Sequence, residues 1–287
     1  MFQIFKRYFL VSIIIGSILT LSSCELINPD EPIPAYIACD SVLFQVSSST
    51  QGSNSSAISD MWVYVDGVIL GTFEFPAHVP ALVEGSHTIT VKPGIMVNGI
   101  SSSRAAYEHY SPYDTTIFFE KEKTHTIHPR STYKSNAFFL QLEDFEQSGL
   151  TFSKAVGSDT TLNIISDQNA FEGRSGSVYL DTAHSYFEYY STLPFPASQG
   201  NLVYCELNYK CDQEFLVGLI AVVGTQQFKE GILTIRSSAD WNKIYINLTD
   251  IVNLYPTASG FKLIISAALP VSKISSSIYL DNIKVIR

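Results

Sequence analysis

Runs in which apolar and polar side chains alternate recur along this chain, and they restrict its fold more than any other feature. In residues 203–211, apolar or aromatic residues occupy every odd position, while Tyr, Glu, Asn and Lys occupy the even ones. A period of two places alternate side chains on opposite faces of a β-strand. Asp66-Gly67 separates two further runs and is typical of a tight hairpin turn. Because such runs fill residues 36–134 and 136–287, the sequence predicts an all-β protein.

The length of the chain favours two domains. Of the 287 residues, about 260 remain after the N-terminal segment described below, which suits domains of roughly 100–200 residues each. We predict a small antiparallel, Ig-like sandwich over residues 36–134 and a two-sheet β jelly roll over residues 135–287. Residues 24–35 contain three prolines and no periodicity, so we expect them to form a tether.

The N-terminus has the features of an export signal. Lys6 and Arg7 precede an almost uninterrupted apolar run over residues 8–19, which is too short to span a bilayer as a helix. Leu21-Ser22-Ser23-Cys24 then resembles the lipobox of bacterial lipoproteins. This resemblance implies that residues 1–23 are removed and that Cys24 is lipidated. The alternative is an ordinary signal peptide with a chance cysteine.

These features imply a location in the bacterial cell envelope. Pro29-Asp30-Glu31-Pro32 resembles the acidic export signals that follow the lipidated cysteine in surface lipoproteins of Bacteroidota. We therefore expect an outer-membrane lipoprotein that faces the periplasm or the cell surface. Acyl chains on Cys24 would hold it to the membrane.

The net charge argues against a nucleic-acid partner, and the spacing of two cysteines argues against a disulfide between them. Loss of Lys6 and Arg7 with the signal moves the net charge from −9 to −11, without any Lys/Arg cluster, which argues against a nucleic-acid partner. Cys205 and Cys211 are six residues apart in one predicted strand, or ~20 Å in an extended chain. That separation is too large for a disulfide, so we expect both cysteines to be buried apolar residues.

The first predicted domain resembles PEGA domains. The matching positions are Val63-Tyr64-Val65-Asp66-Gly67, Gly71, Pro80, Leu82 and the run from Gly85 to Val91. The resemblance implies a small antiparallel sandwich that does not catalyse a reaction. Residues 96–113 form an insertion relative to this pattern, and its tyrosines suit a protein interface.

The second predicted domain resembles carbohydrate-binding modules with a jelly-roll fold. Its marks are an acidic first strand over residues 140–146, the Gly-rich turn at residues 171–176, Trp241-x-Lys243 and the closing Tyr279-Leu280-Asp281-Asn282-Ile283. The resemblance implies glycan binding without catalysis.

The even positions of the middle strands form a candidate glycan-binding face. If the strand at 203–211 and the strand after Trp241 share a sheet, its outer side carries tyrosines among amides, a carboxylate and ammonium groups. Aromatic rings can cover the C–H side of a sugar while the polar groups bind its hydroxyls. The alternative is an ordinary solvated sheet face, since Tyr favours strands. The candidate residues are Tyr204, Glu206, Asn208, Lys210, Lys243, Tyr245 and Asn247, with a third row at Tyr186, Glu188 and Tyr190.

A structural calcium ion is a second candidate, implied by the same resemblance. The oxygens would come from Asp144 or Glu146, from Glu172 and from Asp281. Calcium takes six to eight oxygen ligands, so backbone carbonyls would have to complete the set. Its role would be to stabilise the fold.

No arrangement of residues points to catalysis. Glu143-Asp144-Phe145-Glu146 places two carboxylates on one strand face, but no third acid completes a glycosidase signature. A Gly-x-Ser-x-Gly motif is also absent. We therefore assign no catalytic residue and predict a glycan-binding lipoprotein. The alternative is a structural or adhesion lipoprotein that binds another envelope protein through Tyr107–Tyr113.

Overall fold

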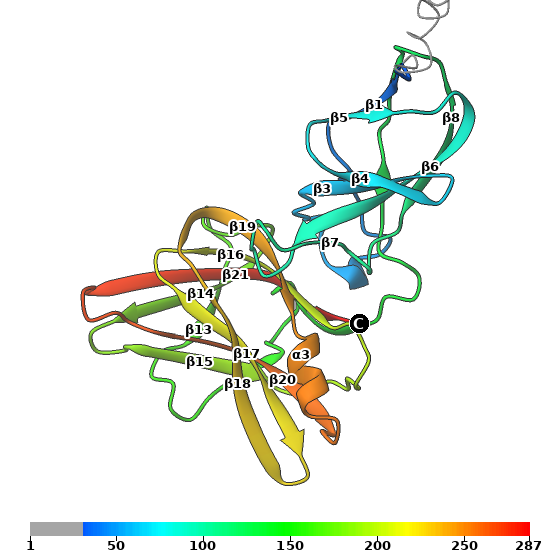
Figure 1. Ribbon diagram of the computed structural model, residues 1–287. Coiled ribbons are helices and arrows are strands. Elements are labelled where there is room, and N and C mark those ends of the chain that lie inside the picture. The colour runs from blue at the N-terminus through cyan, green and yellow to red at the C-terminus, as the bar shows by residue number, and fades with distance from the viewer. Residues whose placement is uncertain (1–30) are drawn as a thin grey trace, which may run out of the picture.

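The computed structural model describes residues 31–287, which form two β domains (Figure 1). Apart from the strands, this part of the chain contains the helix α3 (Thr249–Leu254) and the short 3-10 helix η1 (Ser49–Gln51). The all-β prediction, with a sandwich followed by a jelly roll, is confirmed. The signal segment and Cys24 lie outside the described residues. None of the described helices is long and apolar enough to cross a membrane.

The N-terminal domain packs two layers of short strands around its own core. One sheet has the order β4-β3-β6-β7 with β8 beside β6, and smaller sheets join β5-β1-β9 and β10-β2. Most pairs are antiparallel as expected, whereas β1–β9 and β2–β10 are parallel. The strands are β1 (Ala35–Cys39), β2 (Leu43–Phe44), β3 (Asp60–Val65), β4 (Val68–Glu74), β5 (Ala77–Ala81), β6 (Gly85–Met96), β7 (Arg104–Ala106), β8 (Tyr113–Phe119), β9 (Thr124–Thr126) and β10 (Arg130–Ser131).

The hairpin between β3 and β4 forms where the sequence predicts it. Asp66 and Gly67 have φ values of 50° and 80°, which is the left-handed conformation that a two-residue turn of this type requires. Met61 and Val63 on β3 point into the core, where both are fully buried.

The C-terminal domain is a jelly roll of two facing sheets. We call them the six-stranded sheet, with the order β13-β14-β21-β16-β19 and β11 beside β21, and the five-stranded sheet, with the order β12-β15-β20-β17-β18. The strands are β11 (Phe139–Glu143), β12 (Phe152–Lys154), β13 (Leu162–Ile165), β14 (Ser175–Asp181), β15 (Tyr186–Ser191), β16 (Tyr204–Cys211), β17 (Phe215–Val223), β18 (Gln226–Ile235), β19 (Ser238–Asn247), β20 (Gly260–Ala268) and β21 (Ser275–Ile286).

The core of the jelly roll lies between these two sheets and follows the alternation in the sequence. Cys205, Leu207 and Tyr209 on β16 face it, as do Phe187 and Tyr189 on β15. Cys205 and Cys211 are buried and free, as expected. The polar positions between these residues therefore point to the outer sides of the two sheets.

The N-terminal domain rests on the outer side of the six-stranded sheet (Figure 1). A third apolar cluster fills the junction, and it draws Tyr107, Tyr110 and Tyr133 from one domain and Tyr204 and Tyr245 from the other. Of the two outer faces of the jelly roll, this contact covers the one that carries most of the predicted site.

Candidate functional site

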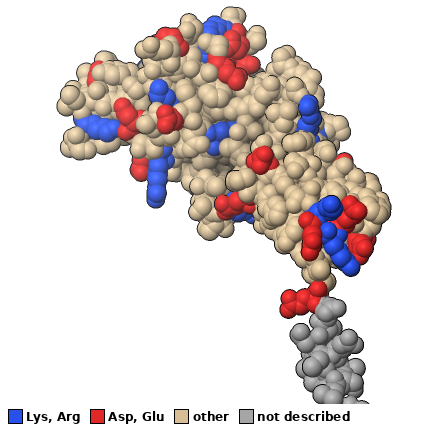
Figure 2. Space-filling view, turned by 90° about the horizontal axis from the view of Figure 1, so that it is seen from above, with Lys and Arg blue, Asp and Glu red and all other residues tan. Residues whose placement is uncertain are grey.

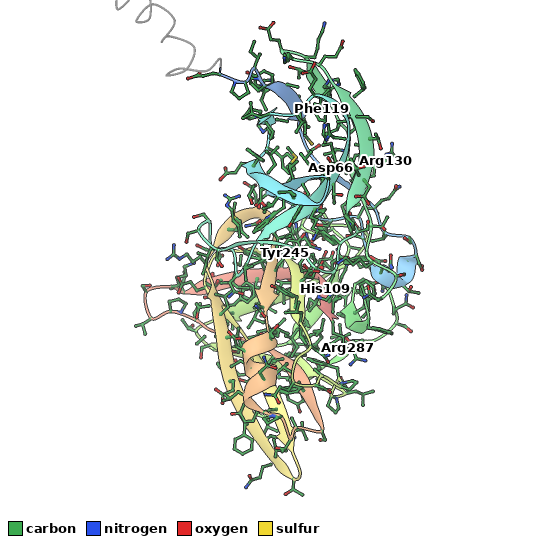
Figure 3. All side chains as sticks on the ribbon, turned by 45° about the vertical axis from the view of Figure 1, so that its right-hand side comes forward. Asp66, His109, Phe119, Arg130, Tyr245 and Arg287 are labelled. Carbon is green, nitrogen blue, oxygen red and sulfur yellow. The ribbon has the colours of Figure 1, made fainter. Side chains whose placement is uncertain are left out.

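The larger part of the predicted glycan-binding face is an interface within the chain. Tyr204, Glu206, Asn208, Lys243 and Tyr245 expose between 0% and 7% of their surface. The prediction that these five side chains bind a glycan is therefore corrected, as is the alternative of a solvated face, because the N-terminal domain covers them. Tyr245 lies between the two domains (Figure 3).

Glu206 is the centre of this interface. Its carboxylate accepts hydrogen bonds of 2.8 Å from the hydroxyls of Tyr107 and Tyr133, and it pairs with the Lys243 ammonium at 2.8 Å. Burial acts to raise the pKa of Glu206, but the ammonium groups of Lys243 and Lys284 outweigh it and hold that pKa below its usual value. The carboxylate is thus an ionised structural group with all its partners inside the protein.

Lys284 supplies a second buried ammonium beside Glu206. Its Nζ lies 3.2 Å from the Tyr133 hydroxyl, and the residue is fully buried. Burial and the nearby Lys243 lower the pKa of Lys284 to about 7, against the opposing effect of Glu206. Lys243 therefore pairs directly with Glu206, whereas Lys284 lies next to the Tyr133 hydroxyl and acts on Glu206 through its charge.

Tyr245 and Asn247 join the domains through further hydrogen bonds. The Tyr245 hydroxyl lies 2.9 Å from that of Tyr110 and accepts a hydrogen bond of 3.0 Å from the backbone N–H of Ala57. The side chain of Asn98 accepts a hydrogen bond of 2.9 Å from the backbone N–H of Asn247. Lys210, by contrast, is half-buried and lies over the Tyr279 ring, at 5.5 Å from its centroid.

The insertion at Tyr107–Tyr113 does form an interface, but its partner is the C-terminal domain of the same chain. Tyr107 and Tyr110 are 3% and 2% exposed, and the Tyr107 ring packs edge-on against Tyr204 with centroids 5.2 Å apart. The alternative that this insertion binds another envelope protein is corrected for Tyr107 and Tyr110, which are already covered, while Tyr113 is half-buried.

The third predicted row lies on the outer face of the five-stranded sheet, away from the N-terminal domain. Tyr186, Glu188 and Tyr190 alternate along β15 with the core residues Phe187 and Tyr189, so all three point outward. Each of the three is partly exposed. We call this surface, with the outward residues of β20, β17 and β18, the open face.

Charged side chains frame the open face. Glu188 on β15 accepts a hydrogen bond from the Tyr186 hydroxyl and pairs with Lys229 on β18. Strands β20 and β17 lie between these two strands in the sheet. The Lys262 ammonium lies over the Tyr190 ring, at 4.8 Å from its centroid. Aromatic, carboxylate and ammonium groups are thus within reach of one ligand here.

The floor between β15 and β18 is apolar. Ile264 and Ile220 do not belong to the core between the sheets, yet they are 1% and 8% exposed. Gly218 pairs with Ile264 on one side and with Gly231 on the other, so the two glycines add no side chains of their own to the floor.

The four residues of the predicted calcium site line one cavity of about 440 Å³. β11 ends at Glu143, so Asp144 and Glu146 lie beyond the strand on which we expected them. Across residues 31–287, no group of three or more His, Cys, Asp or Glu side chains is arranged to hold a metal ion. Asp144, Glu146, Glu172 and Asp281 are therefore neighbours rather than a preformed ligand set, and calcium stays a prediction.

Two of these carboxylates already have protein partners. Asp281 is buried and accepts a hydrogen bond of 2.6 Å from the Ser175 hydroxyl, and burial raises its pKa to about 7. Glu146 accepts a hydrogen bond of 2.6 Å from the backbone N–H of Arg174. Glu143 is buried and accepts hydrogen bonds from Phe145 and Thr151, which is a structural role.

Sequence reasoning missed the residues that frame the open face from β18 and β20, above all Lys229 and Lys262. The alternation in Phe261–Ala267 could have placed Lys262 outward. No local signal pairs Lys229 with Glu188, because 41 positions separate them.

Neither a family model nor the sequence of a curated protein matches this chain. Solved structures that are similar to it include carbohydrate-binding modules. Modules of a Clostridium thermocellum endo-1,4-β-D-xylanase, complexed with xylohexaose, have 17% identity and a TM-score of 0.39, and the match covers 52% of this chain and 28% of that one.

Two further similar structures are single modules. The family 30 module of a Clostridium thermocellum cellulosomal cellulase has 15% identity and a TM-score of 0.37, over 52% of this chain and 96% of that one. A xylan-binding domain from Paenibacillus barcinonensis has 15% identity and a TM-score of 0.37, over 51% of this chain and 98% of that one. The function proposed below rests on the residues of this chain.

Proposed function

We propose that this protein binds a glycan of the cell envelope or its surroundings, without catalysis, on the open face of the C-terminal jelly roll. One observation carries the proposal: Tyr186, Glu188 and Tyr190 form a row on the sheet that the N-terminal domain leaves uncovered. The equivalent groups on the other sheet are engaged inside the protein.

The open face offers the contacts that a sugar requires. A tyrosine ring can pack on the C–H side of a pyranose, while Glu188 accepts and Lys229 donates hydrogen bonds to hydroxyls. The side chain of Lys229 is 48% exposed and that of Glu188 is 13% exposed, so a ligand reaches this pair from the lysine side. A ligand hydroxyl that bridges the two groups would replace this pair.

An array of soluble polysaccharides probed with the purified protein tests the proposal. We expect retention on at least one polymer, and Tyr190→Ala and Glu188→Gln should each weaken binding at least tenfold. Tyr179→Ala is the matched control, because Tyr179 is an exposed tyrosine on β14 of the other sheet. No retention by a folded protein, or equal loss with the control, would rule the proposal out.

We also propose that the protein is anchored to the outer membrane by a lipid on Cys24. The support is the sequence Leu21-Ser22-Ser23-Cys24 after a basic and apolar segment. Growth of an expressing bacterium with radiolabelled palmitate should label the wild type and leave Cys24→Ala unlabelled. Label in both proteins would exclude this cysteine as the attachment point.

A further inference from the structure

The strand β8 forms a free sheet edge on the N-terminal domain, apart from the open face (Figure 1). It pairs with β6 over seven positions without a register shift, and no other described strand pairs with it. Other edge strands carry features that discourage pairing with a second chain. β5 contains Pro80, β18 contains Lys229 and a bulge, and β12 has three residues. β8 has seven residues and contains neither proline nor lysine.

The backbone groups at alternate positions of β8 point away from β6. Thr88 of β6 directs its N–H and C=O towards Asp66 at the end of β3, so the odd positions of β6 face β8. The odd positions of β8 therefore carry its hydrogen bonds to β6, and the even positions point outward. These outward residues are Asp114, Thr116 and Phe118. Their N–H and C=O groups have no partner in the part of the chain that the structure describes.

A depression of about 680 Å³ runs along this free edge. Its second wall is the segment of residues 124–128, which contains β9. The two walls are hydrogen-bonded to one another at both ends, where Lys123 N–H donates to the Glu120 carbonyl and Ser111 N–H to the Thr132 carbonyl. Between these points, no hydrogen bond among the described residues joins the walls. The free edge is therefore accessible to an extended segment.

The depression also contains a buried polar atom without a partner. His125 lines it from β9, and its Nε2 is buried without a hydrogen bond to any described residue. The His125 ring packs edge-on against Phe119, with centroids 5.3 Å apart. On the outer face of β8, Phe118 is 66% exposed, and the carboxylate of Asp114 is exposed as well. A donor or acceptor, an aromatic ring and a negative charge thus flank the free backbone groups.

Two occupants from within this protein do not suit the edge. Residues 24–35 contain three prolines, which cannot donate to a strand ladder. β8 follows the buried Tyr110 at the domain junction and ends beside the start of β1, where Glu122 N–H donates to the Pro34 carbonyl. Two copies of one edge pair antiparallel about a twofold axis. Their N-termini would then lie at opposite ends, which two chains held to one membrane through Cys24 cannot achieve.

We propose that the edge of β8 binds an extended segment of another polypeptide, which adds to the sheet as a further strand. Main-chain hydrogen bonds to Asp114, Thr116 and Phe118 would supply affinity over about five residues, or ~17 Å. A basic side chain opposite Asp114 and an apolar one opposite Phe118 would supply specificity, since such cross-strand pairs are stabilising. This site is independent of the glycan proposal, because it shares no residue with the open face.

The test uses a fluorescein-labelled peptide with the sequence of residues 85–91 that carries Thr90→Lys. This segment of β6 already pairs with β8 from the other side, and position 90 lies opposite Asp114. Fluorescence anisotropy should show saturable binding to the purified protein. The same peptide with N-methyl groups on positions 88 and 90 cannot donate to β8 from that edge, and it should bind at least tenfold more weakly.

Two variants locate the site. Thr116→Pro removes an outward N–H but leaves the hydrogen bonds to β6, because the odd positions carry them, so peptide binding should weaken at least tenfold. Thr116→Val keeps this N–H and is the matched control, which should bind like the wild type. Thermal unfolding checks that Thr116→Pro is folded. If it is not, the N-methylated peptide makes the same comparison on the wild type.

Four results would overturn the inference. Three are an absence of saturable binding, equal affinity for the N-methylated peptide, and equal affinity of a folded Thr116→Pro. The fourth is a dimer of the wild type that Thr116→Pro dissociates in analytical ultracentrifugation, which would assign the edge to a second copy. Each of them leaves the polysaccharide result at the open face untouched, so failure of one proposal is distinguishable from failure of the other.

Discussion

The two sheets of the jelly roll carry the same kinds of side chain on their outer faces, yet they use them differently. On the six-stranded sheet, Glu206 and Tyr245 are fully paired beneath the N-terminal domain. On the five-stranded sheet, Glu188 and Tyr190 are partly exposed, with Lys229 and Lys262 as neighbours. Tyrosines among charged groups therefore indicate a contact surface, but composition does not tell an internal contact from an external one.

The charged side chains on one side of the molecule are mixed in sign. In the view of Figure 2, acidic and basic side chains are scattered in small mixed groups over a mostly uncharged surface. No broad patch of one sign appears on that side.

The largest expected effect comes from removing the carboxylate of Glu206. Glu206→Ala leaves the ammonium groups of Lys243 and Lys284 buried without their counterion, which should cost about 3–5 kcal/mol of stability. Urea denaturation measures the loss. Glu188→Ala, which breaks a partly exposed ion pair and one hydrogen bond of the open face, should cost less than Glu206→Ala, because Lys229 stays in contact with water. Equal losses would show that the two faces do not differ in this way.

A smaller effect is expected from single hydroxyl groups. Tyr245→Phe leaves the Ala57 N–H and the Tyr110 hydroxyl without their buried partner, at a cost of about 1–3 kcal/mol. Tyr190→Phe on the open face should change stability by less than about 0.5 kcal/mol. Thermal unfolding of both variants measures the two changes in stability. A large loss of stability in Tyr190→Phe would contradict the difference between the two faces.

The outer face of the six-stranded sheet, which the N-terminal domain covers, should make stability depend on pH above 7 through Lys284. Burial lowers the pKa of Lys284 to about 7, so between pH 7 and the ordinary lysine range the unfolded chain binds more protons than the folded protein. Stability contributed through this group therefore rises as pH increases above 7. Lys284→Met should flatten the rise in melting temperature between pH 7 and pH 9. An unchanged profile would assign the titration to other groups.

The smallest effect is expected from calcium. Asp281 is tied to Ser175 and Glu146 to Arg174, so a cation would have to compete for both carboxylates. With a dissociation constant of about 1 mM, 10 mM calcium would stabilise the fold by only about 1–2 kcal/mol. The measurement is the melting temperature with calcium and with EDTA. A gain that persists in Asp281→Ala, which has no side-chain oxygen, would exclude this residue as a ligand.

The sequence predicted the layers of the fold well, because alternation sets which side chains face the core. It placed Cys205 and Leu207 inward and Tyr204 and Glu206 outward, as observed. What covers the outward face could not be predicted. The hydrogen bond from Tyr107 to Glu206 joins residues 99 positions apart, and periodicity carries no information about such pairs.

The candidate site was predicted only in part for the same reason. Tyr186, Glu188 and Tyr190 were found because one strand carries all three. Their partners Lys229 and Lys262 come from other strands, and the pairing of β15, β20, β17 and β18 decides where they lie. Strand order is a property of the whole core, so a local pattern does not specify it.

The buried network of Glu206 and tyrosines also sets the orientation of the two domains relative to one another. β1 enters at the end of the N-terminal domain farthest from the jelly roll, and the five-stranded sheet lies at the opposite end of the molecule (Figure 1). Buried hydrogen bonds and an apolar cluster join the two domains, and these contacts oppose independent rotation of the domains about the connection. A chain anchored to a membrane at its N-terminus would then hold the open face away from that membrane at a set distance. Little rotational freedom would be lost when the open face binds a large, immobile polymer.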